Sequence, residues 1–349
     1  MEFVRIDGSY GEGGGSLLRY AIALSSMTMR PVEVFNIRVK RSNPGLRPQH
    51  LNAVRALARL TDALVEGDSV GSLRVRFIPR RKLSGSFEID IGTAGSVSLI
   101  IQAVLPVCLT SEGETVLRIK GGTDVPMAPP IDYMSNVFLP NLSLLGARAE
   151  LRILRRGHYP KGGGIVELRV RPSELSPIRK VERENFSRIS GRCHAVKLPR
   201  SVVERISRSA AEVLRNEGFS VEIEEEWHED DHLGPGAGIV LWSDSNPRVG
   251  ADELGERGKP SEVVGRNAAL KLLGELRTGM AFDNHTGDMI IPYLAIARGA
   301  SRIGISKLTR HAESNIWLVE RFLPVRYNVE GGLDRPSVVE VEGVGLELR

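Results

Sequence analysis

The chain contains little cysteine and no long apolar run. Only two cysteines, Cys108 and Cys193, occur among 349 residues, so a disulfide framework is excluded and a reducing compartment fits. The N-terminal MEFVRIDGSYGEGG does not show the basic-then-apolar pattern of a secretion signal. No apolar run approaches the length needed to span a membrane. We therefore expect a cytoplasmic protein without a membrane anchor.

The usual nucleotide-binding signatures are also missing. No glycine-rich loop ends in Lys-Ser or Lys-Thr, which excludes a Walker-type phosphate loop. The stretch RIDG, residues 5–8, is similar to the lysine-nucleophile motif of ligases, but Arg5 stands where the lysine would be. A guanidinium stays protonated and cannot attack phosphorus, so this chemistry is excluded.

The composition is that of a soluble globular protein, with 41% hydrophobic and 26% charged residues. The length allows two domains, or one large domain that carries an insertion. The sequence pI is about 9.1, and arginines cluster in residues 37–50 and 151–164. This charge is compatible with a phosphate-rich ligand or a nucleic acid.

A β-α-β-α-β-β pattern occurs three times along the chain. The units begin with the strands EFVRID (2–7), SFEIDI (86–91) and GMAFDN (279–284), and each first strand is followed by a turn and a helix. Each unit has one apolar face to bury. We therefore predict an α/β (α+β) fold in which three repeated units pack around a pseudo-threefold axis, with sheets outside and helices inside.

Residues 183–277 do not fit the period, and they contain helical and strand patterns of their own. We interpret them as a small α/β domain inserted into the larger one. The predicted organisation is repeat units one and two in 1–182, the inserted domain in 183–277, and repeat unit three in 278–349.

Two motifs near the N-terminus favour phosphate binding, each with a plain alternative. GEGGGSLLR (11–19) places a glycine turn before a helix; this favours a phosphate cradle, or only a tight turn that needs positive φ. Glu12 fits a cradle if it holds a metal ion shared with the phosphates. If residues 36–41 form a strand, Arg38 and Lys40 share one face; the alternative is a solvated basic loop.

Three further segments contain histidines. WHEDDHLGPG (227–236) could bind a metal through His228 and His232, but Gly234 and Pro235 disfavour a helix there. HTGD (285–288) is expected as a turn before a helix, with Asp288 as its cap, or as part of a cleft. His311 stands where a helix could begin. Its place in the third unit corresponds to the arginine cluster in the first and GGTDVPMAPP (121–130) in the second.

Several blocks in one order resemble the RNA 3′-terminal phosphate cyclase family over nearly the whole length. They are DGSYGEGGGSLLR, RSNPGLRPQHL, GTAGSVSLIIQAVLP, GGTDVPMAPP, GHYPKGGG and NIWLVERFLPVRY. The resemblance implies the same three-unit fold with a small inserted domain.

The resemblance also implies a reaction in which His311 is the nucleophile. The imidazole attacks the α-phosphorus of ATP, and a histidyl-AMP forms as pyrophosphate leaves. AMP then passes to the 3′-phosphate of an RNA. The neighbouring 2′-hydroxyl attacks the activated phosphate, which releases AMP and leaves a 2′,3′-cyclic phosphate.

Other roles are implied position by position. The ATP-binding segments match Gln102, His285, Thr286, Gly287, Asp288 and Met289, and Pro130 matches a residue near the adenine. Glu12 matches a carboxylate near the metal, Mg²⁺ or Mn²⁺, that bridges the triphosphate. The phosphate-lining positions match Arg19, Arg38, Arg41, Gln49 and His50. Bacterial relatives have glutamine where this chain has Met289, so the contact with adenine here would be apolar.

Two rival readings remain at this stage. One is a non-catalytic RNA-binding relative that acts in ribosome assembly, which the intact block around His311 disfavours. The other is a metalloprotein centred on His228 and His232. The expected partners are ATP and an RNA with a 3′-phosphate end, and a homo-oligomer stays open.

Overall fold

The computed structural model describes residues 2–229 and 232–346. Its first sheet runs in the order β1 (Val4–Asp7), β2 (Val32–Phe35), β4 (Val75–Ile78) and β3 (Leu64–Glu66). Strands β1 and β2 are parallel, and the other pairs are antiparallel. Helices α1 (Gly15–Thr28) and α2 (Pro48–Thr61) connect the strands.

The second sheet repeats this arrangement with β5 (Gly85–Asp90), β6 (Thr115–Gly121), β8 (Gly164–Arg171) and β7 (Arg148–Arg155). Its first pair is again parallel and the others antiparallel. The helices are α3 (Val97–Leu109) and a consecutive run of α4 (Ile131–Tyr133), the π-helix η1 (Met134–Phe138) and α5 (Leu139–Ser143).

The third sheet has the same order, with β9 (Arg179–Lys180), β14 (Arg298–Ile305), β16 (Ser337–Val344) and β15 (Tyr327–Glu330). Helices α8 (Asn284–Ile296) and α9 (Arg310–Phe322) belong to it. The prediction that GMAFDN (279–284) forms its first strand is wrong, because this segment makes only isolated bridges through Met280 and Phe282. The two-residue β9 lies beside β14 instead.

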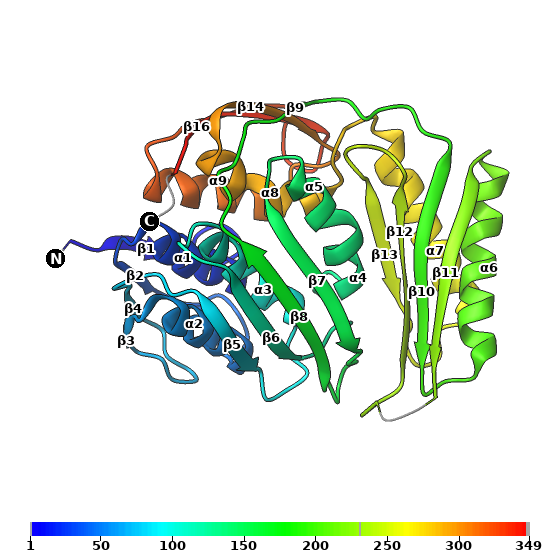
Figure 1. The fold of residues 1–349 in the computed structure, drawn as a ribbon, viewed down its shortest axis with the longest axis horizontal. Coiled ribbons are helices and arrows are strands. Elements are labelled where there is room, and N and C mark those ends of the chain that lie inside the picture. Colours follow the sequence, from blue (N-terminus) through cyan, green and yellow to red (C-terminus); the bar gives the residue numbers. More distant parts are fainter. Residues whose placement is uncertain (1, 230–231, 347–349) are drawn as a thin grey trace.

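In sequence, the strands of the fourth sheet lie between β9 and α8. Because β9 already belongs to the third sheet, this segment interrupts the third unit. It does not lie between the second unit and the third. It has the order β11 (Ser220–His228), β10 (Arg188–Val196), β12 (Gly236–Ser243) and β13 (Gly250–Leu254), with helices α6 (Arg200–Asn216) and α7 (Ser261–Arg277) (Figure 1). Its buried cluster is separate and includes Ile189, Ile206 and Leu272. The exact boundaries of an inserted domain at 183 and 277 stay a prediction.

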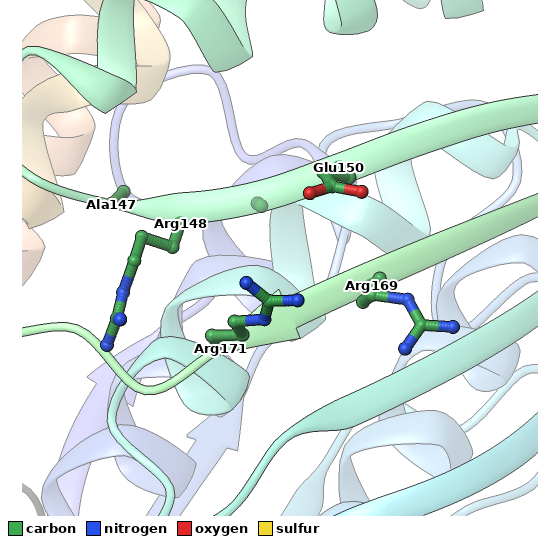
Figure 2. A pocket seen from close by; sticks show the side chains of 6 residues that line it. Ala147, Arg148, Glu150, Arg169 and Arg171 are labelled. Atoms are coloured by element: carbon green, nitrogen blue, oxygen red, sulfur yellow. The ribbon is translucent and has the colours of Figure 1, made fainter.

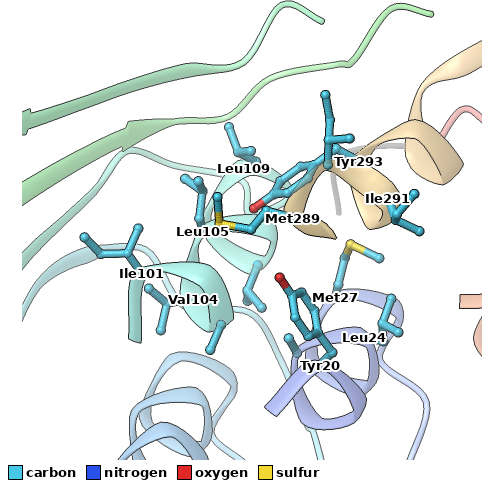
Figure 3. Close-up of a cluster of buried hydrophobic side chains, with 14 of the residues drawn as sticks. Tyr20, Leu24, Met27, Ile101, Val104, Leu105, Leu109, Met289, Ile291 and Tyr293 are labelled. Carbon is cyan, nitrogen blue, oxygen red and sulfur yellow. The ribbon is translucent and has the colours of Figure 1, made fainter. Parts of the chain in front are cut away.

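Helices from the first three sheets meet in the main hydrophobic core. Tyr20 and Leu24 of α1, Leu105 of α3, and Ile291 and Tyr293 of α8 are all nearly inaccessible to solvent (Figure 3). The mixed α/β class is therefore confirmed, whereas the pseudo-threefold axis stays a prediction. No helix in the described part of the chain is long and apolar enough to cross a membrane.

Candidate active site

His311 lies in the first turn of α9, and its neighbours fix where that helix begins. The Thr309 hydroxyl accepts the Ala312 backbone N–H at 3.0 Å, so Thr309 is the N-cap. The same hydroxyl donates to Asp288, and the Asn315 amide donates to the Asp288 carbonyl at 2.7 Å. Asp288 therefore ties α8 to the start of α9.

The prediction that HTGD forms a turn capped by Asp288 is wrong. Helix α8 already begins at Asn284, and its N-cap is Asp283, which accepts the Thr286 N–H at 2.8 Å. Aspartate is favoured at both positions, and Asp283 comes first in the chain, so the helix starts one turn earlier. Asp288 thereby becomes available to contact α9.

Glu12 brings the glycine turn of the first unit to His311. The His311 Nε2 lies 3.7 Å from the Glu12 Oε2, and the Arg41 Nη2 lies 3.8 Å from the same oxygen. All three side chains are between a third and a half exposed. A ligand can therefore reach a histidine, a carboxylate and a guanidinium from three different segments.

Two glycines let this turn approach α9. Gly11 has φ 57°, and a Cβ there would lie 2.7 Å from the Ser314 Oγ on α9. Gly13 has φ 57° as well, a conformation that side chains disfavour. A side chain at Gly11 would press on α9, and one at Gly13 would strain the turn that carries Glu12.

The prediction of a strand over 36–41 is wrong. Strand β2 ends at Phe35, because Asn36 and Arg38 have positive φ and turn the chain. The Arg38 Nη1 donates to the carbonyls of Asn43 at 2.7 Å and Gly45 at 3.2 Å, so this side chain holds its own loop. Lys40 instead ties the loop to the Ser9 carbonyl, at 2.9 Å.

His50 adds a neutral donor beside the glycine turn. The Arg47 backbone N–H donates to its Nδ1 at 3.2 Å, which assigns the ring proton to Nε2. A Cβ at Gly15 would lie only 1.9 Å from this Nε2. Burial, with help from Arg38 and Arg19, lowers the pKa of His50 to about 4. At neutral pH the imidazole is therefore uncharged.

A buried pair joins the first unit to the second. The Arg19 Nη2 of α1 donates to the Gln102 Oε1 of α3 at 3.2 Å. Burial lowers the pKa of Arg19. The Cβ of Gln49, in the first turn of α2, lies 4.0 Å from where a Cβ on Gly95 would be, so α2 also approaches the GTAG turn.

The predicted residues on α8 divide into two groups. Thr286, Gly287 and Met289 are buried; the Thr286 hydroxyl lies 2.8 Å from the Tyr133 hydroxyl, and Gly287 packs against Ile305. His285 is exposed and meets the Tyr133 ring edge-on at 5.6 Å. On this helix, His285 and Asp288 are thus the side chains more open to a ligand.

Burial raises the pKa of Asp288 to about 6, although the Thr309 hydroxyl and the nearby His285 and His311 act in the opposite direction. The carboxyl group therefore titrates close to neutral pH. Its protonation state affects the contact that holds the start of α9.

Pro130 and His228 make no contact with His311, Glu12 or Arg41 that was found among the described residues. Pro130 precedes α4 in the loop that follows β6, so its place near an adenine stays a prediction. The His228 Nε2 lies 2.8 Å from the Glu226 Oε1, and its ring stacks on His232 at 5.3 Å. Asp230 and Asp231 lie outside the described residues.

The outer face of the second sheet has a hollow of about 200 Å³ whose lining includes Arg148, Glu150, Arg169 and Arg171 (Figure 2). Glu114 accepts from Arg169 at 2.7 Å and from Arg171 at 2.9 Å. Because these arginines are already paired on an exposed face, we do not place the candidate site there.

Sequence reasoning missed two supports of the site. Thr309 could have been found, because threonine two residues before His311 is a typical N-cap. Tyr10 stacks on Trp317 with ring centroids 3.9 Å apart, which joins the glycine turn to α9. No local signal predicts this contact between residues so far apart in sequence.

The comparisons with known proteins agree with one another. The family model described as RNA 3′-terminal phosphate cyclase matches residues 10–329. A curated protein of that name from Korarchaeum cryptofilum is 76% identical over 348 residues, which covers 100% of both chains. Proteins of the same name from Staphylothermus marinus and Pyrococcus furiosus are 51% and 47% identical, over 99% and 96% of this chain and 99% and 98% of theirs.

Proposed function

Because the chain belongs to the RNA 3′-terminal phosphate cyclase family, we propose that it is an ATP-dependent enzyme that converts an RNA 3′-terminal phosphate into a 2′,3′-cyclic phosphate. The observation that carries this proposal is the approach of His311 and Arg41 to the same oxygen of Glu12. A nucleophile, a carboxylate and a cation face one another where a triphosphate could enter.

In the first step, the His311 Nε2 attacks the α-phosphorus of ATP. A P–N bond forms, the bond to the bridging oxygen breaks, and pyrophosphate leaves. Negative charge near this phosphorus is favoured by the N-terminus of α9, which carries His311 in its first turn. Arg41 and the neutral Nε2–H of His50 are placed to donate to the phosphates.

In the second step, an oxygen of the RNA 3′-phosphate attacks the histidyl-AMP. The P–N bond breaks, and an RNA linked to AMP through a pyrophosphate bond forms. The 2′-hydroxyl then attacks the terminal RNA phosphorus, loses its proton and expels AMP. Adenylation is needed because a phosphate monoester has no good leaving group.

The residues present fit a divalent cation, Mg²⁺ or Mn²⁺. Such ions take one or two carboxylates together with substrate phosphates and water. The half-exposed Glu12 offers one carboxylate at the glycine turn and would hold the ion there. When bound, the cation would neutralise part of the charge on the triphosphate.

The RNA end would approach from the side of the second unit. A hollow of about 320 Å³ there is lined by Thr93 of the GTAG turn, by Lys161, and by Lys120, which donates to Asp90 at 3.0 Å. A Cβ on Gly162 would lie 2.8 Å from the Ala94 Cα, so GHYPKGGG and GTAG pack together. The Lys161 side chain along such a hollow suits a phosphate backbone.

The experiment that tests the proposal is incubation of the protein with ATP labelled at the α-phosphate. The intact chain is expected to retain covalent label, and His311→Ala is expected to lose both the label and cyclisation of a 3′-phosphorylated RNA. His311 is half-exposed, so its replacement should leave the fold intact. His228→Ala is the matched control, because it removes a histidine from a distant segment.

Normal labelling of His311→Ala would contradict the nucleophile assignment. His285→Ala is expected to be milder, since this exposed side chain is proposed only to contact ATP. An intact chain that binds RNA but never retains AMP would instead support the non-catalytic RNA-binding alternative.

A further inference from the structure

A second polar cluster lies away from the histidine just described, between the second unit and the fourth sheet. Asp124 follows β6, His158 lies in the loop between β7 and β8, and His194 lies on β10. These residues are only 2%, 5% and 1% exposed. Two buried histidines beside a buried carboxylate are not explained by apolar packing.

The geometry of the cluster suits a metal ion. The two Nε2 atoms are 2.9 Å apart, and each lies 3.9 Å from the Asp124 Oδ2. The point in their plane that is equidistant from all three atoms lies about 2.1 Å from each, which is the bond length that zinc makes to imidazole nitrogen and carboxylate oxygen. We propose that Asp124, His158 and His194 bind a divalent transition-metal ion, with Zn²⁺ as the natural probe.

The two imidazole rings pack directly against glycines of β12, where a side chain would leave no room for them. A Cβ on Gly236 would lie 2.1 Å from the His158 Cδ2, and one on Gly238 would lie 3.1 Å from the His194 Cε1. Both glycines belong to β12. A side chain at Gly236 would push His158 away from His194.

The charges of the cluster favour another cation. The Arg156 guanidinium is shared by three carboxylates: Asp124 at 3.4 Å, Asp132 at 2.7 Å and Glu226 at 2.7 Å. The Arg192 Nη1 also lies 3.7 Å from the Asp132 Oδ1, so two guanidiniums face three carboxylates, and with Arg156 only 1% exposed, water does little to screen the remaining negative charge. A divalent ion bound to Asp124 would offset it.

Buried polar atoms without a hydrogen-bond partner also support a bound metal ion. Within the described part of the chain, the Nδ1 atoms of His158 and His194 and the Oδ1 of Asp124 have no hydrogen-bond partner. The His194 Nδ1 lies 3.9 Å from the Asp132 Oδ2, so a small shift would give the carboxylate–histidine–metal arrangement common in proteins. The hydrogen bond between the two imidazoles pairs only their Nε2 atoms and leaves these other polar atoms without a partner.

The ion would have a structural role. It would join the fourth sheet, through His194, to the loop after β6 that leads to Pro130. It would therefore fix the position of the inserted segment relative to the second unit. This site is separate from the carboxylate of Glu12 proposed for the triphosphate.

The test is a Zn²⁺ titration of the full chain after removal of metals, in competition with a chromophoric chelator. The intact protein is expected to bind one equivalent at this site. His158→Gln and His194→Gln are each expected to lose at least about 100-fold in affinity, since even residues behind a metal ligand cost 10–100-fold. His311→Ala, at the separate candidate site, is the control that should keep the ion, whereas His228→Gln tests the neighbouring pair of His228 and His232.

Co²⁺ absorption and X-ray absorption of the Zn²⁺-loaded intact protein need no variant. They are expected to show four or five ligands, of which two are imidazoles. An intact protein that binds no equivalent of Zn²⁺, or binds it with fewer than two imidazoles, overturns the proposal. Loss of the ion in His228→Gln with retention in His158→Gln would move the site to His228 and His232.

Discussion

At the scale of single residues, the candidate site combines side chains that hold the structure with side chains that are free to meet a ligand under the proposed function. Arg38 and Arg41 illustrate the difference. Arg38 donates to carbonyls of its own loop, whereas Arg41 lies beside Glu12, and its Nη2 would be 3.4 Å from a Cβ on Gly14. Neighbouring arginines of one cluster can therefore have different roles.

Arg41→Ala is expected to lower the rate of protein adenylation by about 10–100-fold, because a hydrogen bond to a charged group contributes about 1.5–3 kcal/mol. The loss should persist when salt is added, since direct contacts are screened less than distant charges. The measurement is the AMP-labelling rate at low and moderate salt. Arg152→Ala, on exposed strand β7, is the control. Equal small losses in both variants would point to a solvated basic surface.

The pKa of Asp288, raised to about 6, gives a pH-dependent stability. Between pH 4 and 6 the folded state holds a proton that the unfolded chain has lost, so stability falls as pH rises through this window. Asp288→Asn removes this fall. Its free energy of unfolding, relative to the intact chain, is expected to increase by about 2–3 kcal/mol from pH 4 to pH 7.

Urea unfolding at these two pH values measures this difference. Asp90→Asn serves as the control, because a backbone N–H of Gly92 and Lys120 lower the pKa of that exposed aspartate. The free energy of unfolding of Asp90→Asn, relative to the intact chain, should not rise between pH 4 and pH 7. A flat difference for Asp288→Asn would mean that Asp288 is ionised in the folded protein throughout.

At the scale of elements, the start of α9 decides where His311 lies. Thr309 contributes to it twice, as the acceptor for Ala312 and as the donor to Asp288. The Tyr10–Trp317 stack and the close approach of Gly11 to Ser314 hold the opposite segment. The positions of His311 and Glu12 thus depend on contacts between α9 and the glycine turn.

Thr309→Val should destabilise the protein by about 1 kcal/mol or more, because a lost N-cap typically costs 0.5–2 kcal/mol. It should also slow AMP-labelling, since His311 stands two residues further on. Thr309→Ser keeps the hydroxyl and is expected to restore both properties. Urea unfolding and the labelling rate are measured for both variants. Normal labelling in Thr309→Val would show that the cap does not position His311.

At the scale of the whole molecule, the inserted segment contributes to the body into which it is inserted. Val240 and Trp242 belong to the main core, and the Gly250 N–H donates to Asp283 at 2.8 Å. Glu275 accepts the Asn284 N–H at 3.2 Å. The start of α8 is therefore held in part by residues of the inserted segment, none of which was predicted as a site residue.

Removal of residues 183–277 tests this dependence. The ends are neighbours, since the Arg183 N–H donates to the Gly279 carbonyl at 2.9 Å, so a short glycine linker can join them. The shortened chain is expected to unfold at a lower temperature and to label with AMP about tenfold more slowly, because α8 loses contacts worth about 1 kcal/mol each. Glu275→Ala in the full chain removes only the contacts of this carboxylate with the Asn284 N–H and the Ser306 hydroxyl. Unchanged labelling of the shortened chain would show that the three units suffice.

The sequence by itself determined the mixed α/β class, most strands and helices, the family, and the presence of a helix that begins near His311. These features depend on local periodicity, turn residues and capping, which can be read along the chain. The glycine turn before α1 was predicted for the same reason, since its glycines have φ values that other residues disfavour.

Tertiary structure alone decided how distant segments meet. The two-residue β9 is too short to show a period, so only its pairing with β14 reveals that the insertion interrupts the third unit. The loop of Arg38 turns where alternation suggested a strand, because contacts with carbonyls and with the glycine turn replace a strand partner. Asp124, His158 and His194 lie on three separate segments of the chain, and burial between two sheets brings them together. No spacing in the sequence encodes such a meeting, because it depends on packing across the whole fold.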